Sequence, residues 1–153
     1  MTADENALQI DTDPDLRDVQ ALRTGLWEYN VARTGDSNGD DLAIMVRDDD
    51  GQLRGGLYGW TWSGVLEVNA LWVREDERGK GLGSRLLAAA EAEGRKRGCW
   101  LAVLDTHSFQ APAFYQARGY EVWATLDGYP TGHSKMYLRK RLTAPASDEP
   151  SQE

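Results

Sequence analysis

The sequence has few of the features that mark disulfide-rich, membrane-spanning or secreted proteins. It contains one cysteine, Cys99, so no internal disulfide can form, and we expect a reducing, cytoplasmic location. No apolar run approaches the roughly 20 residues that a membrane-spanning helix needs. The acidic start, Met1–Asn6, lacks the basic and apolar pattern of a secretory signal. We therefore expect no membrane partner.

Positive charge is also scarce. Lysine and arginine number 17 against 25 aspartates and glutamates, which leaves a formal net charge of −8. A nucleic-acid partner needs a clustered positive field, so this balance argues against one, while it mildly favours a basic amine as substrate. The chain has only two histidines, and no group of His, Cys and acidic residues has the spacing of metal ligands, so we expect no metal.

The length of 153 residues is enough for one domain with a proper core. We expect this domain to span residues 7–142, between a disordered N-terminus at 1–6 and a disordered tail at 143–153. The tail is rich in Pro, Ser and Glu, a composition that cannot bury enough apolar surface to fold.

Hydrophobic periodicity and turn residues predict the elements of this domain. Ala7–Ile10 is predicted as a short strand, followed by a helix from an N-cap at Asp13 to a C-cap at Gly35. Three strands in hairpin succession come next, at Leu42–Arg47, Gln52–Trp62 and Val65–Val73. A helix, a buried strand, a short helix and two strands follow, at Gly81–Arg97, Trp100–Thr106, Gln110–Arg118, Tyr120–Leu126 and His133–Leu142. The predicted class is α+β, with a mixed, mostly antiparallel central sheet flanked by helices on both faces.

One stretch, Val73–Ser84, combines charge and glycine where the first predicted internal helix begins. Three glycines alternate with Lys80 and Leu82, and Arg78 precedes them. Free N–H groups at a helix N-terminus, together with the helix dipole, form a site for phosphate oxygens. The stretch is neither a P-loop, because no Ser or Thr follows Lys80, nor a G-x-G-x-x-G fingerprint. It reads instead as R-x-x-G-x-G, and a tight turn with solvated charges is the alternative to phosphate binding.

A second pattern lies at the start of the later short helix. It runs from Ser108 through Ala111 and Tyr115 to Gly119 and Tyr120. Together with Arg78–Gly83, this pattern resembles the two signatures of the GNAT superfamily of N-acetyltransferases, in the branch of bacterial, small-molecule-type members with unassigned substrates. The resemblance covers about Leu42–Leu142 and includes the order of the predicted elements. It departs from the family pattern at Ser108, which replaces the usual Asn.

The resemblance implies an acyltransferase that moves an acetyl group from acetyl-coenzyme A to a primary amine of a small molecule, by direct attack in a ternary complex. It implies coenzyme contacts from the end of the third hairpin strand, from the glycine-rich turn and from the second signature. These residues are Leu71, Trp72, Val73, Arg78, Gly79, Lys80, Gly81, Leu82, Gly83, Ser84, Ser108 and Ala111.

Two residues are candidates for the chemistry. Tyr115 matches the family's general acid, which protonates or hydrogen-bonds the leaving thiolate. Glu67 is the first candidate for the general base, because strict alternation along Val65–Val73 puts it with Asn69, Leu71 and Val73 on one face of an otherwise apolar strand. A solvent-facing carboxylate is the alternative. His107 is the second candidate, and a water chain is the third.

The acceptor pocket is the least specified part of the sequence. The candidates to line it are Trp27, Asn30, Asn69, His107 and His133. Two other functions stay open: an enzyme that acetylates a protein N-terminus or lysine, and a non-catalytic acyl-coenzyme A sensor. A homodimer through the basic strand His133–Leu142 is also possible, although a solvated edge accounts for the same charges.

Overall fold

The structure is a computed structural model that describes residues 8–144. The chain divides into two units, residues up to Ser37 and residues from Asn38 onward, and each is described by itself. The predicted disordered N-terminus at 1–6 lies outside the described residues, as does all of the predicted tail at 143–153 except Thr143 and Ala144. Thr143 and Ala144 belong to no helix or strand.

The first unit contains one helix, α1, at Leu16–Thr34. Asp15 is its N-cap, and a capping box joins the side chains of Asp15 and Asp18 to the backbone. Gly35 ends the helix in the left-handed conformation at φ 74°, as the sequence predicts. The start predicted at Asp13 is two residues early, because Asp15 rather than Asp13 accepts the hydrogen bond of the first turn. The strand predicted at Ala7–Ile10 is wrong for its described residues, since 8–10 form no strand.

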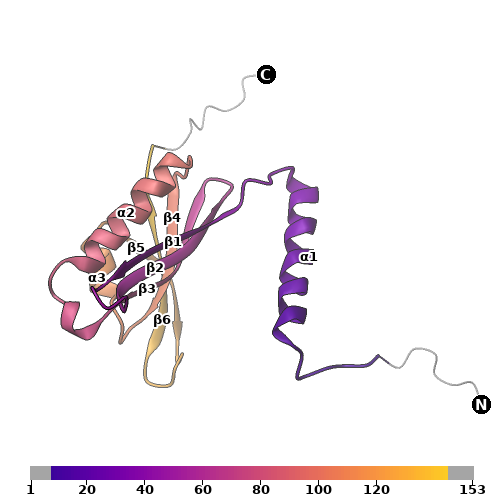
Figure 1. The fold of residues 1–153 in the computed structure, drawn as a ribbon, viewed down its shortest axis with the longest axis horizontal. Helices are drawn as coiled ribbons and strands as arrows, with labels where there is room; N and C mark the ends of the chain where they lie inside the picture. Colours follow the sequence, from indigo (N-terminus) through magenta and orange to yellow (C-terminus); the bar gives the residue numbers. More distant parts are fainter. Residues whose placement is uncertain (1–7, 145–153) are drawn as a thin grey trace, which may run out of the picture. The chain divides into compact units, whose positions relative to one another are not determined.

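The second unit is built on a six-stranded sheet (Figure 1). Its strands are β1 (Asp40–Arg47), β2 (Leu53–Trp62), β3 (Val65–Val73), β4 (Leu101–His107), β5 (Glu121–Asp127) and β6 (Ser134–Arg141). The spatial order is β1-β2-β3-β4-β6-β5, and β3 with β4 is the only parallel pair in the described sheet. A mixed, mostly antiparallel sheet is therefore confirmed. The parallel pair is possible because a helix crosses over between its strands.

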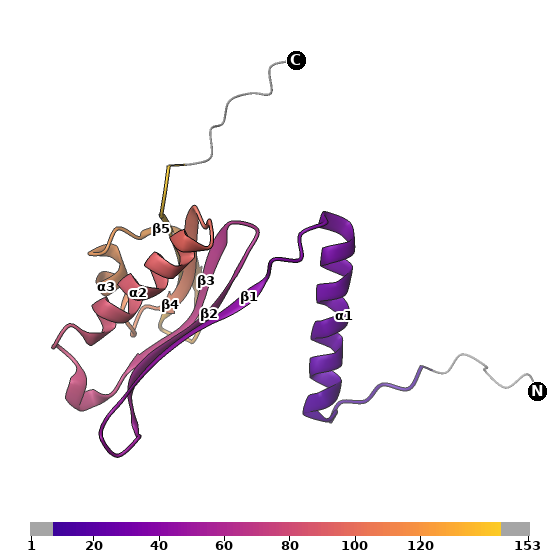
Figure 2. The ribbon, with the colours of Figure 1, turned by 45° about the horizontal axis from the view of Figure 1, so that its top comes forward.

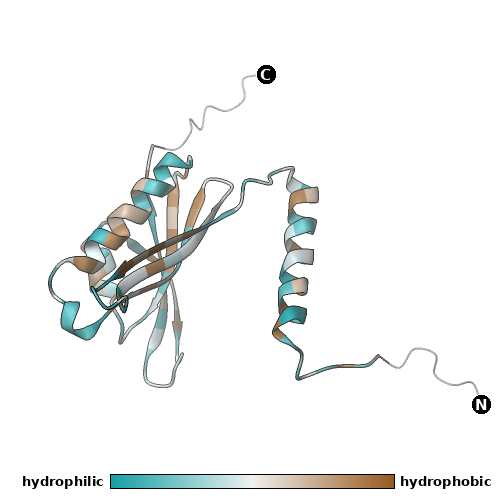
Figure 3. Ribbon diagram, viewed as in Figure 1, coloured by the Kyte–Doolittle hydropathy of each residue, from teal (hydrophilic) through white to brown (hydrophobic). Residues whose placement is uncertain are grey.

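The helices of this unit lie on one side of the sheet (Figures 1 and 2). They are the 3-10 turn η1 (Glu75–Glu77), the helix α2 (Leu82–Lys96) and the short helix α3 (Pro112–Gln116), which starts with its proline in the first turn, where no N–H is needed. The core between α2 and the sheet contains Leu57, Leu66, Leu86, Leu87, Ala102 and Leu138, all at most 2% exposed. Apolar segments run along the strands, while the turn through η1 is hydrophilic (Figure 3). In the part of the chain that the structure describes, no helix is long and apolar enough to cross a membrane.

A bulge in β3 changes which side chains face the core. Tyr58 of β2 pairs with Ala70, but the next residue, Gly59, pairs with Val68, so Asn69 has no partner across this ladder. A Cβ at position 59 would collide with the carbonyl oxygen of Glu67, so the close approach of the two backbones requires glycine.

The bulge corrects the face assignment made for this strand. Leu66 and Val68 are buried, and beyond the bulge Leu71 and Val73 pack against the same core. The prediction that Leu71 and Val73 share a face with Glu67 is therefore wrong. One extra residue shifts the two-residue period by one, so every later side chain changes sides.

One buried carboxylate links α2 to the last two strands. Glu91 of α2 is 6% exposed. Its Oε2 accepts a hydrogen bond of 2.9 Å from the hydroxyl of Tyr120, and its Oε1 accepts one of 3.0 Å from Nζ of Lys140. Burial and the charge of Glu91 both raise the pKa of Tyr120, which keeps the phenol protonated as donor. If the carboxylate were removed, the buried hydroxyl of Tyr120 and the partly buried ammonium of Lys140 would each lose this partner.

We expect Glu91→Ala to lower the free energy of unfolding by about 3 kcal/mol, since it breaks a buried ion pair and strands its partners. The matched control is Glu93→Ala on the same helix, whose carboxylate pairs with Arg97 at 3.1 Å and is 38% exposed. It should cost less than about 1 kcal/mol. Urea denaturation measures both, and equal losses would contradict a stabilising role for the network.

Candidate active site

The sheet opens between β3 and β4. Parallel pairing runs from Val65 with Leu101 to Val68 with Leu104 and stops there, one residue before the bulge at Asn69. Beyond this point β3 still pairs with β2 through Val73. The other edge of residues 70–73 therefore has no strand partner among the described residues. Apart from the Val73 carbonyl oxygen, which accepts a hydrogen bond from Arg78, the backbone groups on this edge are available to a ligand that runs along the strand.

A cavity of about 920 Å³ occupies this opening. It is lined by the end of β3, the glycine-rich turn, the first turn of α2, the end of β4 and α3. Both sequence patterns contribute to its lining. The glycine-rich turn supplies Arg78–Ser84 without Lys80, and the segment Gln110–Arg118 supplies residues of another part of the wall. An extended ligand with both an anionic and an acyl end can therefore contact both patterns at once.

The first turn of α2 presents free N–H groups to this cavity. Gly81 is the N-cap at φ 84°, with no side-chain cap, and Gly79 precedes it at φ 75°. A Cβ at either position meets no atom within 4 Å, so the left-handed backbone rather than crowding requires glycine here. The turn leaves the N–H groups of α2 uncapped, and the helix dipole adds partial positive charge.

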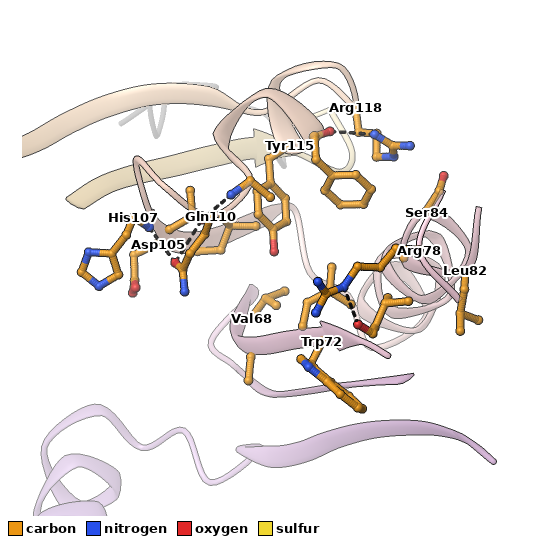
Figure 4. Close-up of a pocket in the computed structure, with 18 of the residues that line it drawn as sticks. Val68, Trp72, Arg78, Leu82, Ser84, Asp105, His107, Gln110, Tyr115 and Arg118 are labelled. Carbon is orange, nitrogen blue, oxygen red and sulfur yellow. Dashed lines mark hydrogen bonds between the residues drawn. The ribbon is translucent and has the colours of Figure 1, made fainter. Parts of the chain in front are cut away.

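Two arginines add full positive charge. Nε of Arg78 donates a hydrogen bond of 3.0 Å to the carbonyl oxygen of Val73, which holds the guanidinium beside the end of β3. Arg118 lies over the ring of Phe114, with its Cζ 3.8 Å from the ring centroid, and one of its terminal nitrogens donates to the Phe114 carbonyl at 2.8 Å. Both arginines line the cavity on the side of Ser84 (Figure 4). Nε of Arg118 is buried and has no hydrogen-bond partner in the described part of the chain.

Hydrogen bonds between β4 and the loop after it position α3. The side-chain Oε1 of Gln110 accepts from the backbone N–H of His107 at 2.7 Å and from the hydroxyl of Thr106 at 3.3 Å. The N–H of Ala111 donates to the Thr106 hydroxyl oxygen at 3.4 Å. These contacts place the start of α3, and hence Tyr115 one turn later, against the end of β4.

Tyr115 points its hydroxyl into the cavity (Figure 4). The residue is 7% exposed, and its ring packs edge-on against Phe114 and Tyr120, with centroids 5.1 Å and 5.8 Å away. Burial raises the pKa of the Tyr115 phenol, and the negative charge of Asp105 raises it further. The hydroxyl therefore stays protonated and can donate a hydrogen bond across the neutral pH range.

Acidic and aromatic side chains lie at the other end of the cavity. Asp105 and His107 of β4 line the cavity, and Figure 4 shows them on the side opposite Arg118 and Ser84. The His107 ring stacks on Phe109 at 5.3 Å, and its Nδ1 lies 3.0 Å from the carbonyl oxygen of Tyr129. The two ends of the cavity therefore differ in charge: Arg78 and Arg118 lie at one end, and the carboxylate of Asp105 lies at the other.

The structure brings most of the predicted coenzyme residues together. Those that line the cavity are Leu71, Trp72, Val73, Arg78, Gly79, Gly81, Leu82, Gly83, Ser84 and Ala111. Lys80 and Ser108 are not among the lining residues. The Ser108 hydroxyl accepts a hydrogen bond of 3.0 Å from the N–H of Ser134, so it joins β4 to β6.

The predicted catalytic and acceptor residues divide in the same way. Tyr115, Asn69 and His107 line the cavity. Glu67 and His133 do not, although the His133 ring packs on Phe109, with centroids 5.0 Å apart. Trp27 and Asn30 lie on α1 in the first unit, which is described by itself. Among residues 8–144 no group of three or more His, Cys, Asp or Glu can hold a metal.

Sequence reasoning missed several residues of the cavity, among them Asp105, Gln110 and Arg118. For Asp105 a signal was present, because it is a carboxylate in an apolar strand, the same argument that singled out Glu67. For Arg118 the spacing from Phe114, four residues along the predicted helix Gln110–Arg118, indicated a shared face, although α3 itself ends at Gln116. Nothing in the spacing of Gln110 indicated that its amide would bridge β4 and α3.

Comparisons with known proteins agree with this geometry. The sequence profile described as the Acetyltransferase (GNAT) family matches residues 8–120. The acetyltransferase Atu2258 of Agrobacterium fabrum is 42% identical over 123 residues, which cover 80% of this chain and 90% of that protein. The blasticidin-S acetyltransferase of Streptomyces morookaense is 47% identical over 96 residues, covering 60% and 68%.

A solved acetyltransferase structure from Agrobacterium tumefaciens superposes with a TM-score of 0.80 at 40% identity, over 88% of this chain and 98% of that one. The profile match crosses from the first unit into the second, so one family domain includes both. The profile match and the identity to Atu2258 show that the chain belongs to the GNAT family of acetyltransferases.

Proposed function

We propose that the protein transfers the acetyl group of acetyl-coenzyme A to a primary amine of a small molecule, by direct attack within a ternary complex. The observation that carries this proposal is the single cavity that joins an anion-binding helix start, an unpaired strand edge and a buried tyrosine hydroxyl. The substrate in the name of the blasticidin-S acetyltransferase supports a small-molecule acceptor.

Three features suit the donor. The uncapped N–H groups after Gly81, with Arg78 and Arg118, suit the phosphates of the coenzyme. The free edge of residues 70–73 suits an amide-containing arm, because it offers unpaired backbone donors and acceptors. A backbone N–H of Leu71–Val73 is then the donor for the oxyanion that forms when the amine attacks the thioester carbonyl.

Tyr115 serves the leaving group. Full proton transfer from a phenol with a pKa near 10 to a thiolate with a pKa near 8.5 is uphill by about 2 kcal/mol. The raised pKa of Tyr115 makes the transfer less favourable still, so the hydroxyl acts mainly as a hydrogen-bond donor to the sulfur as negative charge develops.

The acceptor must lose a proton before it attacks. An alkyl ammonium has a pKa of about 10.4, so freeing its lone pair at pH 7 costs roughly 4–5 kcal/mol, and a base lowers this cost. His107 lines the cavity, whereas Glu67 stands outside the lining and would act through water. Profiles of kcat/KM against pH for His107→Gln and Glu67→Gln distinguish the two, since loss of the base moves the ascending limb to higher pH. A profile identical to wild type removes that residue.

The function itself is tested with a panel of amines and acetyl-coenzyme A, read by release of the free thiol. The panel contains alkyl amines, diamines, blasticidin S, and peptides with a free N-terminus or a lysine. We expect turnover with small amines. Turnover with peptides alone would make the protein a protein acetyltransferase, and tight coenzyme binding without any turnover would make it a sensor.

We expect Tyr115→Phe to lower kcat about a hundredfold while the dissociation constant for coenzyme A stays the same, because the ring packing remains and only the donor is lost. Because the pKa of Tyr115 is raised, wild-type kcat should show no descending limb below pH 10. An unchanged kcat in the variant would remove Tyr115 from the chemistry.

Arg118→Met should weaken coenzyme A binding about tenfold, measured by calorimetry, since methionine keeps the packing on Phe114 but removes a charged donor. Arg85→Met is the matched control, because Arg85 is an exposed residue of α2 that does not line the cavity. Equal affinities in both variants would show that Arg118 does not contact the coenzyme.

A further inference from the structure

Asp105 is an acidic side chain of the cavity that the reaction scheme does not use. Two acidic residues line the cavity, Glu77 and Asp105. Glu77 is fully engaged, since both its oxygens accept hydrogen bonds from Arg54, at 2.9 Å and 3.0 Å. Asp105 has one ion pair, a single contact of 3.5 Å between its Oδ1 and Nζ of Lys135, and half of its side chain is exposed. Its carboxylate is thus held weakly.

Lys135 is held by its surroundings as well as by Asp105. Its side chain is 21% exposed, and its Nζ lies 5.5 Å from the ring centroids of both Tyr129 and Tyr137. Asp105 pairs with Tyr137 across the β4–β6 ladder, and His107 pairs with Lys135, so these four side chains form two adjacent rows of the sheet. Rings and a carboxylate around an ammonium are the chemistry that recognises an organic cation.

We propose that Asp105 and the rings beside it bind a cationic group of the acceptor other than the amine that is acetylated, and that this group displaces Lys135. The acceptor is thus a compound with at least two basic groups. This inference rests on the proposed function and specifies its acceptor class.

The ion pair of Asp105 separates the bound group from the reacting one. The carboxylate already pairs with the ammonium of Lys135, so a cation that replaces Lys135 takes an ion-pair position and stays protonated. The reacting amine therefore belongs near Tyr115, and in Figure 4 Gln110 lies between Tyr115 and Asp105. Displacing Lys135 from Asp105 breaks one contact of 3.5 Å to a half-exposed carboxylate, and such partly exposed ion pairs contribute little to stability.

The test compares α,ω-diamines of three to eight carbons with the monoamines of equal length, for example cadaverine with pentylamine. Binding is measured by calorimetry with the full chain in the presence of coenzyme A, and turnover by thiol release with acetyl-coenzyme A. For at least one chain length we expect the diamine to bind about fivefold tighter than its monoamine in the wild type. Asp105→Asn should abolish this ratio, with the affinity for coenzyme A unchanged.

Lys135→Met distinguishes recognition from a structural role. It keeps an apolar side chain against Tyr129 and Tyr137 but removes the competing ammonium, so the preference for the diamine should rise severalfold. If the ion pair only stabilised the sheet, both variants would change the ratio in the same direction. Glu121→Gln is the charge-matched control, since it breaks the 3.0 Å pair with Arg139 at β5 and β6 without touching the cavity lining.

The binding measurement separates this inference from the proposed function. Diamine preference that depends on Asp105 supports the inference even if no amine is acetylated. Equal binding and equal turnover of diamines and monoamines by the wild type would overturn it, while leaving the acetyltransferase proposal intact. A diamine preference that survives Asp105→Asn would also overturn it.

Discussion

The site depends on the end of strand pairing between β3 and β4. Pairing stops at Val68 and Leu104, and the bulge at Asn69 follows at once. If β4 paired with β3 beyond Val68, the backbone hydrogen-bonding groups of residues 70–73 would be used by β4, and β4 would occupy the space of the cavity. The interruption instead leaves one edge unpaired, and it returns Leu71 and Val73 to the core side, so the strand stays packed while its edge is free.

The cavity also has a direction set by charge. The uncapped start of α2 and the two arginines gather positive charge at one end, and Asp105 puts negative charge at the other. A donor with phosphates and an acceptor with ammonium groups are therefore attracted to opposite ends. In the proposed reaction, the thioester end of the donor and the acceptor amine meet between these two ends, where the hydroxyl of Tyr115 points.

Much of the fold was predictable because local signals were strong. Gly35 and the glycine-rich stretch before α2 each need backbone conformations that few residues adopt, and the structure has them there. The strands and the parallel pair followed from apolar runs and from the helix between them. The errors came at the short N-terminal strand and at the face of β3. The error in β3 arose because a bulge leaves no mark in a two-residue period until the partner strand is known.

The sequence by itself determined the family, because R-x-x-G-x-G and the pattern around Tyr115 each lie within a single segment. Only the tertiary structure decided which side chains share the cavity. Glu67 and Asp105 look alike in the sequence, each a carboxylate in an apolar strand. They differ because β4 carries Asp105 into the opening beside α3, whereas Glu67 precedes the bulge, where β3 and β4 are still paired. That difference arises from pairing between strands far apart in the chain, which no local pattern records.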